Sequence, residues 1–552
     1  MEIKARLQEA IAAAATKAIA AGELPEAPLP EVLLEVPPQK DLGDFSTNFA
    51  MQGAKLFKKA PRQIAEALIK HLDADFVDKV EVAGPGFINF YLNAGTITDN
   101  LRSIIARLDT FGTLPKNNLG KMQIEYVSAN PTGPLHIGHG RGAAAGSAMV
   151  NICRAAGYDV QAEYYINDAG SQVDNLAKSV NHRYLELLGK AKADDFPENG
   201  YHGADIIDTA QRIIKKDGEK YLGLDEGERL AVFKELALQE KIAALKEDLA
   251  AFRVEYDRWY SERTLHPEKV EAAKDELLAN GNAYEKDGAI WLNSTKYGDD
   301  KDRVIIRDNG LGTYLAADIA YHRDKYERGF SKMINLWGAD HHGYVARIKA
   351  AMAGLGFDSS KLEVKLLQMV RLMRGGELVK LSKRTGDTIT LAELIEEVGT
   401  DAARYFFIMR STDSQLDFDM DLAKSQSNDN PVYYVQYAHA RICSIFRSAT
   451  EAGLTASTDN LQMLGNRREI DLINKLSSYE EEILLAAREL APQRIPRYLY
   501  ELASLFHSFY NECRIIGESK ELGEARLSLL AVVGHALRHG LGLIGVTAPE
   551  KM

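Results

Sequence analysis

Two histidines, His136 and His139, lie in a stretch crowded with glycine and proline, SANPTGPLHIGHGRGAA over residues 128–144. The residues before it, KMQIEYVS, alternate apolar and polar side chains as a strand does, and those after it read as a helix of small residues closed by Gly157. Because a helix N-terminus presents unpaired N–H groups and a partial positive charge, it favours anions. The segment therefore predicts a phosphate-binding turn.

The turn differs from the common nucleotide-binding loops. It has neither GxxxxGK[ST] nor GxGxxG followed by a ribose-binding acid. Four glycines, among them Gly133 and Gly138, let a bulky ligand approach the backbone. The spacing of His136 and His139 can aim both rings at one phosphate, where two imidazole donors stabilise the charge that grows during displacement at phosphorus. The alternative is a turn with two surface histidines, but the pattern P-x-G-x-x-H-I-G-H after a strand favours the phosphate site.

A second candidate loop reads RGGELVKLSKRTGDTITL over residues 374–391. Lys380 and Lys383 flank Leu381 and Ser382 in a turn-rich segment, and ammonium groups on such a loop suit a polyphosphate leaving group. Alone, K-x-S-K describes a solvated loop equally well. Its position at the far end of the same α/β region favours the functional interpretation.

These loops need a scaffold, and the chain divides into three parts. Residues 1–115 predict a compact α+β domain, and a linker at TLPKNNLGK leads into a Rossmann-like α/β catalytic domain over 116–400. The α/β pattern stops at about 170–300, which predicts a helical insertion, and we expect strand-like RVIIRD to resume it. Residues 401–552 read as helical almost throughout and predict an all-α bundle.

The bulk properties exclude several classes of protein. The 552 residues carry only three cysteines, far apart, which argues against a disulfide framework or a zinc site and fits a reducing cytosol. The N-terminus reads as an amphipathic helix instead of a targeting peptide, and charged residues interrupt the most apolar late stretch, so we expect no membrane span. The net charge of −12 leaves a nucleic-acid partner open, because local basic clusters decide such binding.

The two loops together resemble the signatures of class I aminoacyl-tRNA synthetases. The sequence over 136–139 is HIGH, and that over 380–384, KLSKR, is similar to KMSKS with Leu381 for methionine and Arg384 for the last serine. The resemblance implies a Rossmann-like catalytic domain split by a connective insertion. It also implies ATP-dependent activation of an amino acid to an adenylate, followed by transfer to the 3′ end of a tRNA.

Further motifs resemble the arginyl-tRNA synthetases of bacterial type. They include GDFSTNFAM, GPGFINFYL, YYINDAGSQ, YDRWYSE, TYLAADIAYHRDKY, WGADHHGY and NPVYYVQYAHARICSI, in order along nearly the whole chain. The N-terminal part resembles that family's additional domain, which contacts the outer corner of tRNA. VGTDAARYFFIMRS and the helices after it are similar to a DALR-type anticodon-binding region, with Ala403 in place of the usual leucine.

An arginine substrate needs acceptors that hold a planar guanidinium. Glu125 and Asn130 stand where the first strand ends, and Tyr314 and Asp318, four apart, share a helix face. The resemblance implies that Glu125 and Asn130 hold the α-amino end or the side chain of arginine, and that Tyr314 and Asp318 hold its guanidinium. Buried acceptors would reject other amino acids by about 10⁴–10⁵, so no editing domain is expected.

The resemblance also implies the ATP site. Asp340 in WGADHH would lie beside both adenosine and arginine; an alternative interpretation of its neighbouring histidines is a metal site. Mg²⁺ would arrive with ATP, and no protein-bound zinc is expected. His136, His139, Lys380 and Lys383 are the predicted catalytic residues, and the residues predicted to bind ATP are Gly133, His136, Gly138, His139, Asp340, Lys380, Ser382 and Lys383.

The tRNA contacts follow from the same resemblance. Asn89, with Phe87 or Phe90 stacking nearby, would meet a base of the tRNA elbow. Tyr437, His439 and Arg441 would face the anticodon loop from a bundle helix, where stacking on a base contributes about 1–3 kcal/mol. Core tyrosines on an ordinary helix are the alternative explanation. The expected partners are tRNA(Arg), arginine and ATP, and the expected protein is a cytoplasmic monomer.

Three rival functions share some of these features. Another class I synthetase, such as the cysteinyl type, would need zinc-binding cysteines that the chain lacks. A small-molecule nucleotidyltransferase would not need over 100 residues on each side of the catalytic region. A non-catalytic tRNA-binding paralogue would be expected to lose His136, His139 or Lys383.

Overall fold

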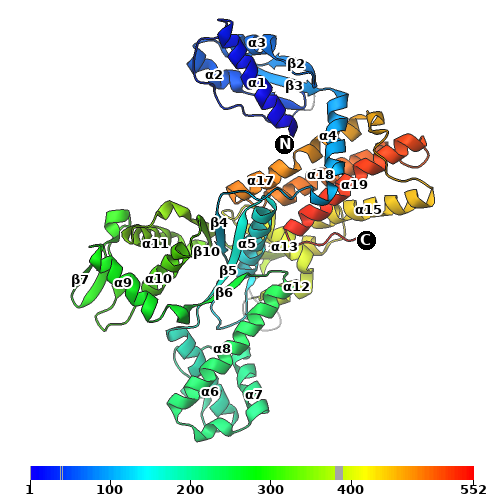
Figure 1. The fold of residues 1–552 in the computed structure, drawn as a ribbon. Helices are drawn as coiled ribbons and strands as arrows, with labels where there is room; N and C mark the ends of the chain where they lie inside the picture. The colour runs from blue at the N-terminus through cyan, green and yellow to red at the C-terminus, as the bar shows by residue number, and fades with distance from the viewer. Residues whose placement is uncertain (1, 38, 40–41, 380–388) are drawn as a thin grey trace.

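The computed structural model describes residues 2–37, 39, 42–379 and 389–552, which form an N-terminal domain, a central α/β part and a C-terminal helical part (Figure 1). An N-terminal α+β domain is joined by a helix to an α/β centre, which carries two outgrowths, and a helical bundle packs against that centre. The predicted class of fold is therefore confirmed: an α/β catalytic centre lies between an N-terminal α+β domain and a C-terminal helical region.

The N-terminal domain packs three helices against a three-stranded antiparallel sheet of order β1-β3-β2. Leu7 and Ile11, which made α1 amphipathic in the sequence, are 0% and 1% exposed, because the apolar face of that helix covers α3. The elements are α1 (Glu2–Ala20), β1 (Phe45–Thr47), α2 (Phe49–Phe57), α3 (Pro61–His71), β2 (Val77–Ala83) and β3 (Phe87–Leu92).

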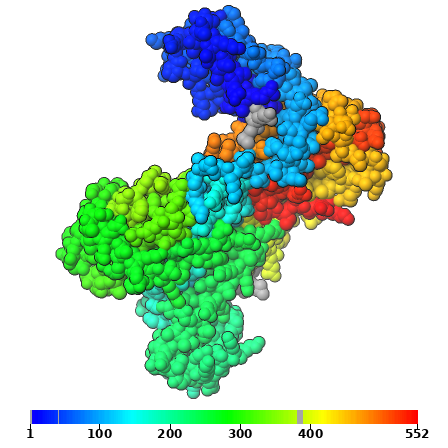
Figure 2. All heavy atoms as spheres, viewed as in Figure 1, coloured from blue at the N-terminus to red at the C-terminus, as the bar shows by residue number. Residues whose placement is uncertain are grey.

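A helix that the sequence interpretation missed, α4 (Ala94–Ala106), connects this domain to the rest of the molecule. It contacts α16 (Arg467–Ser477) and α19 (Lys520–Leu543) of the C-terminal bundle. Asn474 of α16 donates a hydrogen bond of 2.6 Å to Asp44, and Arg107 pairs with Glu480. The N-terminal domain thus projects from the molecule but is fastened to the bundle at its base (Figure 2).

The α/β centre is a five-stranded parallel sheet of order β11-β10-β4-β5-β6. The predicted strand, turn and helix over 121–157 are confirmed by β4 and α5, and Gly157, just after the helix, has a positive φ of 87°. The elements are β4 (Lys121–Glu125), α5 (Ile137–Ala155), β5 (Asp159–Ile166), β6 (Arg258–Ser261), α10 (Tyr314–Glu327), β10 (Lys332–Gly338), α11 (His342–Gly354) and β11 (Leu362–Leu367).

Two details of the predicted organisation are wrong. The range 170–300 is not one insertion, because β6 returns in its middle to pair with β5 in the parallel sheet. The strand over 303–306 does not resume that sheet; it lies in a small antiparallel sheet of order β7-β8-β9. The outgrowths are therefore α6 (Ser171–Leu187), α7 (Ala204–Asp217) and α8 (Glu226–Ala251), then α9 (Glu268–Ala279), β7 (Ala283–Lys286), β8 (Ala289–Leu292) and β9 (Arg303–Ile306).

Residues 401–552 are mostly helical, as predicted, with one exception. Strand β14 pairs in parallel with β12, which itself pairs with β13. The elements are β12 (Val370–Arg374), β13 (Glu377–Val379), α12 (Leu391–Val398), α13 (Thr400–Ile408), β14 (Leu416–Asp419), α14 (Met420–Lys424), α15 (Pro431–Glu451), α16 (Arg467–Ser477), α17 (Tyr479–Glu489), α18 (Arg494–Glu512) and α19 (Lys520–Leu543). Across the described ranges, no helix combines the length and apolar character needed to cross a membrane.

Candidate active site and tRNA-binding surfaces

The strand order creates a crevice at the carboxyl end of β4. From β4 the chain crosses to β5 on one side, and it later returns to β10 on the other side. The connections on the two sides of β4 therefore leave in opposite directions, which opens the crevice where open α/β sheets bind ligands. Glu125 ends β4 at this place, and the histidine turn follows it.

The histidine turn is held by reciprocal caps at the start of α5. His136 is the N-cap residue, and its Nδ1 accepts hydrogen bonds from the backbone N–H groups of Gly138 (3.1 Å) and His139 (3.4 Å). In return, Nδ1 of His139 accepts from the backbone N–H of His136 (3.3 Å). A nitrogen that accepts carries no proton, so in each neutral ring the proton lies on Nε2, which can donate to a ligand.

The two rings are placed to act on one group. They stack with centroids 3.7 Å apart and an interplanar angle of 23°. Burial lowers the pKa of His136, and burial together with the neighbouring ring lowers the pKa of His139 to about 4. Both imidazoles are therefore neutral donors at neutral pH. A Cβ on Gly138 would lie 3.0 Å from Cε1 of His136, which explains the glycine beside the ring.

Backbone strain marks the step between β4 and the turn. Val127 and Ser128 have φ of 69° and 43°, a left-handed conformation that non-glycine residues rarely adopt, least of all β-branched ones. The Ser128 hydroxyl donates to Glu125 (2.9 Å) and accepts from the backbone N–H of Tyr165 (3.1 Å). Such strain concentrates at functional sites. Its location could not be found from the sequence, because neither residue type is typical of a left-handed turn.

Three carboxylates gather around the crevice. Asp318 accepts a hydrogen bond from the Tyr344 hydroxyl, and burial, with Glu125 and Glu262 nearby, raises the pKa of Asp318 to about 7. Glu262 follows β6 and is 8% exposed, and burial raises its pKa as well. Sequence reasoning did not assign Glu262. The available signal was its place as the last residue of YDRWYSE, directly after a strand.

The other predicted arginine ligands are accessible. Tyr314 opens α10 and is 59% exposed, one turn before Asp318 on the same helix. Asn130 is exposed in the turn, and Asp340 is exposed just after β10, with its carboxylate 3.5 Å from Nε2 of His341. Within the described ranges, no group of three or more His, Cys, Asp or Glu side chains could hold a metal ion.

The predicted leaving-group residues Lys380, Ser382 and Lys383 lie outside the described residues. The chain that follows them is fastened to the histidine turn. Thr390 forms an antiparallel bridge with His136, and the backbone N–H of Leu391 donates to the carbonyl of Leu135 (2.7 Å). Thr390 also caps α12 in a capping box with Glu393.

The three residues predicted to contact the tRNA elbow differ in how far they are exposed. All three lie on β3, with Phe87 37% exposed, Asn89 3% exposed and Phe90 1% exposed. Phe90 belongs to the hydrophobic core of the domain. Of the two aromatic rings that we considered for stacking, only Phe87 is presented at the surface.

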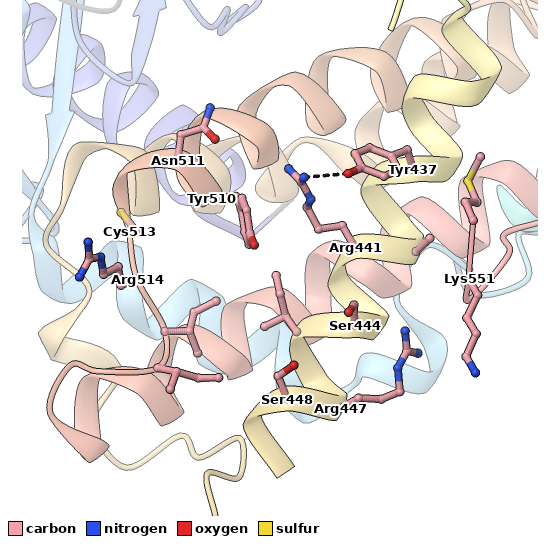
Figure 3. A pocket seen from close by; sticks show the side chains of 15 residues that line it. Tyr437, Arg441, Ser444, Arg447, Ser448, Tyr510, Asn511, Cys513, Arg514 and Lys551 are labelled. Carbon is pink, nitrogen blue, oxygen red and sulfur yellow. Dashed lines mark hydrogen bonds between the residues drawn. The ribbon is translucent and has the colours of Figure 1, made fainter. Parts of the chain in front are cut away.

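The structure brings Tyr437 and Arg441 together on α15, but not His439. The Arg441 guanidinium donates to the Tyr437 hydroxyl (2.7 Å) and lies 4.4 Å from the centre of the Tyr510 ring (Figure 3). His439, two residues from each, points to the other side of the helix, where Nδ1 lies 3.0 Å from the carbonyl of Pro549. Residues on one helix share a face at spacings of three and four, and His439 does not fit that spacing.

A cavity of 710 Å³ surrounds Arg441 and joins α15 to the end of α18 and to the C-terminus (Figure 3). Besides apolar side chains, its lining combines two tyrosine rings with cationic groups, namely those of Arg441, Arg447, Arg514 and Lys551. Aromatic rings beside cations are the usual means of holding unpaired nucleotides. Tyr433, Tyr434 and His507 line an adjoining cavity of 550 Å³.

Three models of known protein families match consecutive parts of the chain. Residues 1–92 match the arginyl tRNA synthetase N-terminal domain, 102–425 match the tRNA synthetases class I (R) catalytic domain, and 435–552 match the DALR anticodon binding domain. The histidine turn and the crevice lie within the second match, and the Arg441 cavity lies within the third.

The whole chain is also similar in sequence to full-length arginine–tRNA ligases. The chain is 50% identical to the arginine–tRNA ligase of Desulforamulus reducens over 556 aligned residues, which cover 100% of this chain and 99% of the relative. It is 49% identical to the arginine–tRNA ligase of Bacillus subtilis over the same shares of the two proteins.

Solved structures extend the comparison to the fold. A putative arginyl-tRNA synthetase from Campylobacter jejuni superimposes with a TM-score of 0.77 at 36% identity, covering 84% of this chain and 100% of its own. The arginyl-tRNA synthetase of Thermus thermophilus has a TM-score of 0.76 at 23% identity and shares the fold over 99% of both chains. On this evidence, the chain belongs to the arginyl-tRNA synthetases, in class I of the aminoacyl-tRNA synthetases.

Proposed function

We propose that this chain joins arginine to tRNA(Arg) with the residues gathered at the carboxyl end of β4. As an arginine–tRNA ligase, it activates L-arginine with ATP to arginyl-adenylate and then transfers the arginyl group to the 3′ end of the tRNA, releasing AMP and pyrophosphate. The observation that carries the assignment of the site is the pair of stacked, Nε2-protonated histidines at the start of α5, beside the crevice that β4 and β10 form.

In the first step, the arginine carboxylate attacks the α-phosphorus of ATP in line and pyrophosphate leaves. Nε2–H of His136 and of His139 would donate to the phosphate oxygens as charge grows on them. Gly133 and Gly138 give the nucleotide room, and Mg²⁺ enters with ATP as part of the substrate. Little covalent catalysis by the protein is needed, since positioning and electrostatics supply most of the rate.

Lys380 and Lys383, with Ser382 between them, would draw off the pyrophosphate. The anchored chain at Thr390 supports this role: Lys383 is seven residues before Thr390, which pairs with His136. Seven residues span at most about 25 Å, so the length of chain between Lys383 and Thr390 allows the lysine to reach the histidine turn.

Arginine would lie between the end of β4 and α10. Glu125 and Asn130 would hold its α-amino end or its side chain, and Tyr314 and Asp318 its guanidinium, with Asp340 near both substrates. The three carboxylates around the crevice support a cationic substrate, because its charge relieves their mutual repulsion.

The tRNA would contact both ends of the molecule. The exposed ring of Phe87, with Asn89 beside it, would meet the elbow. Tyr437 and Arg441 would meet the anticodon loop, and the aromatic and cationic lining of the cavity around Arg441 supports that contact. We propose residues 1–115, 116–400 and 401–552 as the corresponding domains, and a monomer in the cytoplasm as the working form.

ATP–pyrophosphate exchange with each of the twenty amino acids, with and without total tRNA, tests the function. Exchange should depend on arginine alone, and by family resemblance should require tRNA. Exchange driven by another amino acid, or no exchange even when tRNA is present, would contradict the proposal.

The role of the lysine loop has its own test, the substitution Lys383→Ala. The rate of adenylate formation should fall about 100-fold or more, while the Kd of arginine changes little, because the ammonium acts on the leaving group. Lys361→Ala, which removes an exposed lysine elsewhere in the α/β centre, serves as the control. Equal losses in rate and in arginine affinity would show instead that the loop is structural.

A further inference from the structure

A lysine beneath the crevice has no role in the scheme above. Lys325 lies near the end of α10 and is 0% exposed. Its ammonium pairs with the Glu125 carboxylate and donates to Oδ1 of Asn335 on β10 (2.8 Å). The third side of the ammonium faces the Tyr321 ring, 4.4 Å from the ring centre. Each of its donors therefore has a partner within the protein.

Lys325 joins the two elements that carry the proposed arginine ligands. Glu125 belongs to β4, while Asp318 lies on α10, seven residues before Lys325 and on the same side of the helix. Asn335 continues the network, since its amide lies 2.8 Å from Nε2 of His322, whose Nδ1 lies 2.8 Å from the carbonyl of Asp318. The strand end and the helix are thus tied together through one buried cation.

Stability alone is a weak reason for such a pair. Burying two charges costs several kcal/mol per ion, and well-packed apolar residues of similar volume are often as stable. The pair instead controls the charge of the crevice, where Glu125 would otherwise face Asp318 and Glu262 without a nearby counterion. Without the ammonium, repulsion between the like-charged carboxylates would turn Glu125 away from its present position.

We propose that Lys325 is a positioning residue for arginine binding, which directs the Glu125 carboxylate at the substrate, supplies the positive charge that faces it and ties it to the helix that carries Asp318. This inference rests on the proposed role of Glu125. Lys325 should therefore affect the affinity for arginine, through Glu125, and should not affect the affinity for ATP.

The first test compares Lys325→Met with the wild type by ATP–pyrophosphate exchange in the presence of tRNA. The KM of arginine should rise about 10- to 100-fold, the effect of losing a hydrogen bond between charged groups, while the KM of ATP stays the same. Lys325→Arg, which keeps the charge, should recover part of the affinity. Lys269→Met serves as the matched control, because it removes a lysine paired with Asp324 on the same helix but not connected to Glu125.

A pH profile separates an electrostatic role from a structural one. The charged and titratable groups that face Asp318 are Glu125, Glu262, Tyr165, Tyr344, His322 and Lys325. Of these, Lys325 favours the ionised carboxylate by its charge. The midpoint below which the arginine KM rises should therefore move to higher pH in Lys325→Met and remain in place in Lys325→Arg.

A double-mutant cycle covers the possibility that Lys325→Met alone does not fold. Glu125→Gln with Lys325→Met removes both buried charges and should fold, with an arginine KM equal to that of Glu125→Gln alone. A further, additive loss in the double variant would overturn the proposal, and so would a Glu125→Gln enzyme with unchanged arginine KM. An equal rise in the KM of ATP would also overturn it. Failure of the proposed function would be distinct, because the wild type would then show no arginine-dependent exchange.

Discussion

His136 performs two tasks with one ring. Its Nδ1 accepts the backbone N–H groups that open α5, so the same hydrogen bonds that cap the helix also orient Nε2–H. His139 returns a cap to His136, and the two rings stack. The orientation of the proposed catalytic groups therefore comes from an ordinary cap at a helix N-terminus, and neither ring needs a further residue to fix its tautomer.

The substitution His136→Asn separates these two tasks. Asparagine is a good N-cap, so the melting temperature should change little. When its Oδ1 accepts the cap, its shorter side chain leaves the amide N–H donors short of the position that Nε2–H occupies. The kcat of exchange should fall about 100-fold or more with an almost unchanged arginine KM. His202→Asn, at an exposed histidine of the outgrowth, provides the control. A large rise in arginine KM with normal kcat would contradict the assignment.

Asp318 predicts a pH dependence for arginine binding. Its pKa is raised from 3.8 to about 7, so the carboxylate takes up a proton as the pH falls through neutrality. The substrate guanidinium stays charged at every working pH, and it then loses its counter-charge. The arginine KM should rise below about pH 7, by up to about tenfold per pH unit. In Asp318→Asn this dependence should disappear, and the KM of ATP, measured at the same pH values, serves as the reference.

At the scale of the element, α5 is placed by its contact with β4. A Cβ on Gly146 would lie 2.2 Å from Cγ of Tyr126, so the helix reaches the strand end only because this residue is glycine. Tyr126 cannot retreat, since it is 1% exposed and stacks on Tyr256 at 4.5 Å. The position of His136 and His139, the proposed catalytic histidines, therefore depends on a small residue farther along the same helix.

Gly146→Ala should accordingly destabilise the enzyme and lower kcat together. Overpacking of this kind costs about 1–3 kcal/mol, and the shift of α5 moves both rings from the crevice. Gly542→Ala is the matched control, because a Cβ there meets nothing within 4 Å and Gly542 is exposed on α19. That control should be neutral or stabilising by up to about 1 kcal/mol. Equal melting temperatures for the two variants would contradict the packing argument.

Across the whole molecule, the proposed tRNA contacts stand on regions far apart in the chain. The N-terminal domain projects beyond α4, while the Arg441 cavity lies in the C-terminal bundle (Figures 1 and 2). Arg404 joins the parts between them: it donates to Ser147 of α5 (2.7 Å), to the carbonyl of Phe252 after α8 (2.8 Å) and to that of Ile544 after α19 (2.8 Å). Burial lowers its pKa to about 10, which leaves it charged at neutral pH.

Arg404→Met should lower the melting temperature, corresponding to a loss of about 3 kcal/mol or more of unfolding free energy. The variant leaves three buried acceptors without a donor, and each hydrogen bond to a charged group contributes about 1.5–3 kcal/mol. Arg410→Met, at an exposed arginine just beyond the same helix, should melt as the wild type does. Differential scanning fluorimetry distinguishes the two outcomes, and similar transitions for both variants would remove Arg404 from this role.

Local patterns in the sequence determined the strand, turn and helix around His136 and the helical character of the C-terminal region, because caps, turns and periodicity act between near neighbours. The motifs along the chain determined the family resemblance. Only the tertiary structure decided that β6 belongs to the parallel sheet and that β9 leaves it, since strand pairing joins residues distant in sequence. For the same reason, the sequence could not show that Lys325 neutralises Glu125, 200 residues away, or that Glu262 lies near Asp318. Spacing placed the candidate groups on their elements, and the packing of those elements decided which groups meet.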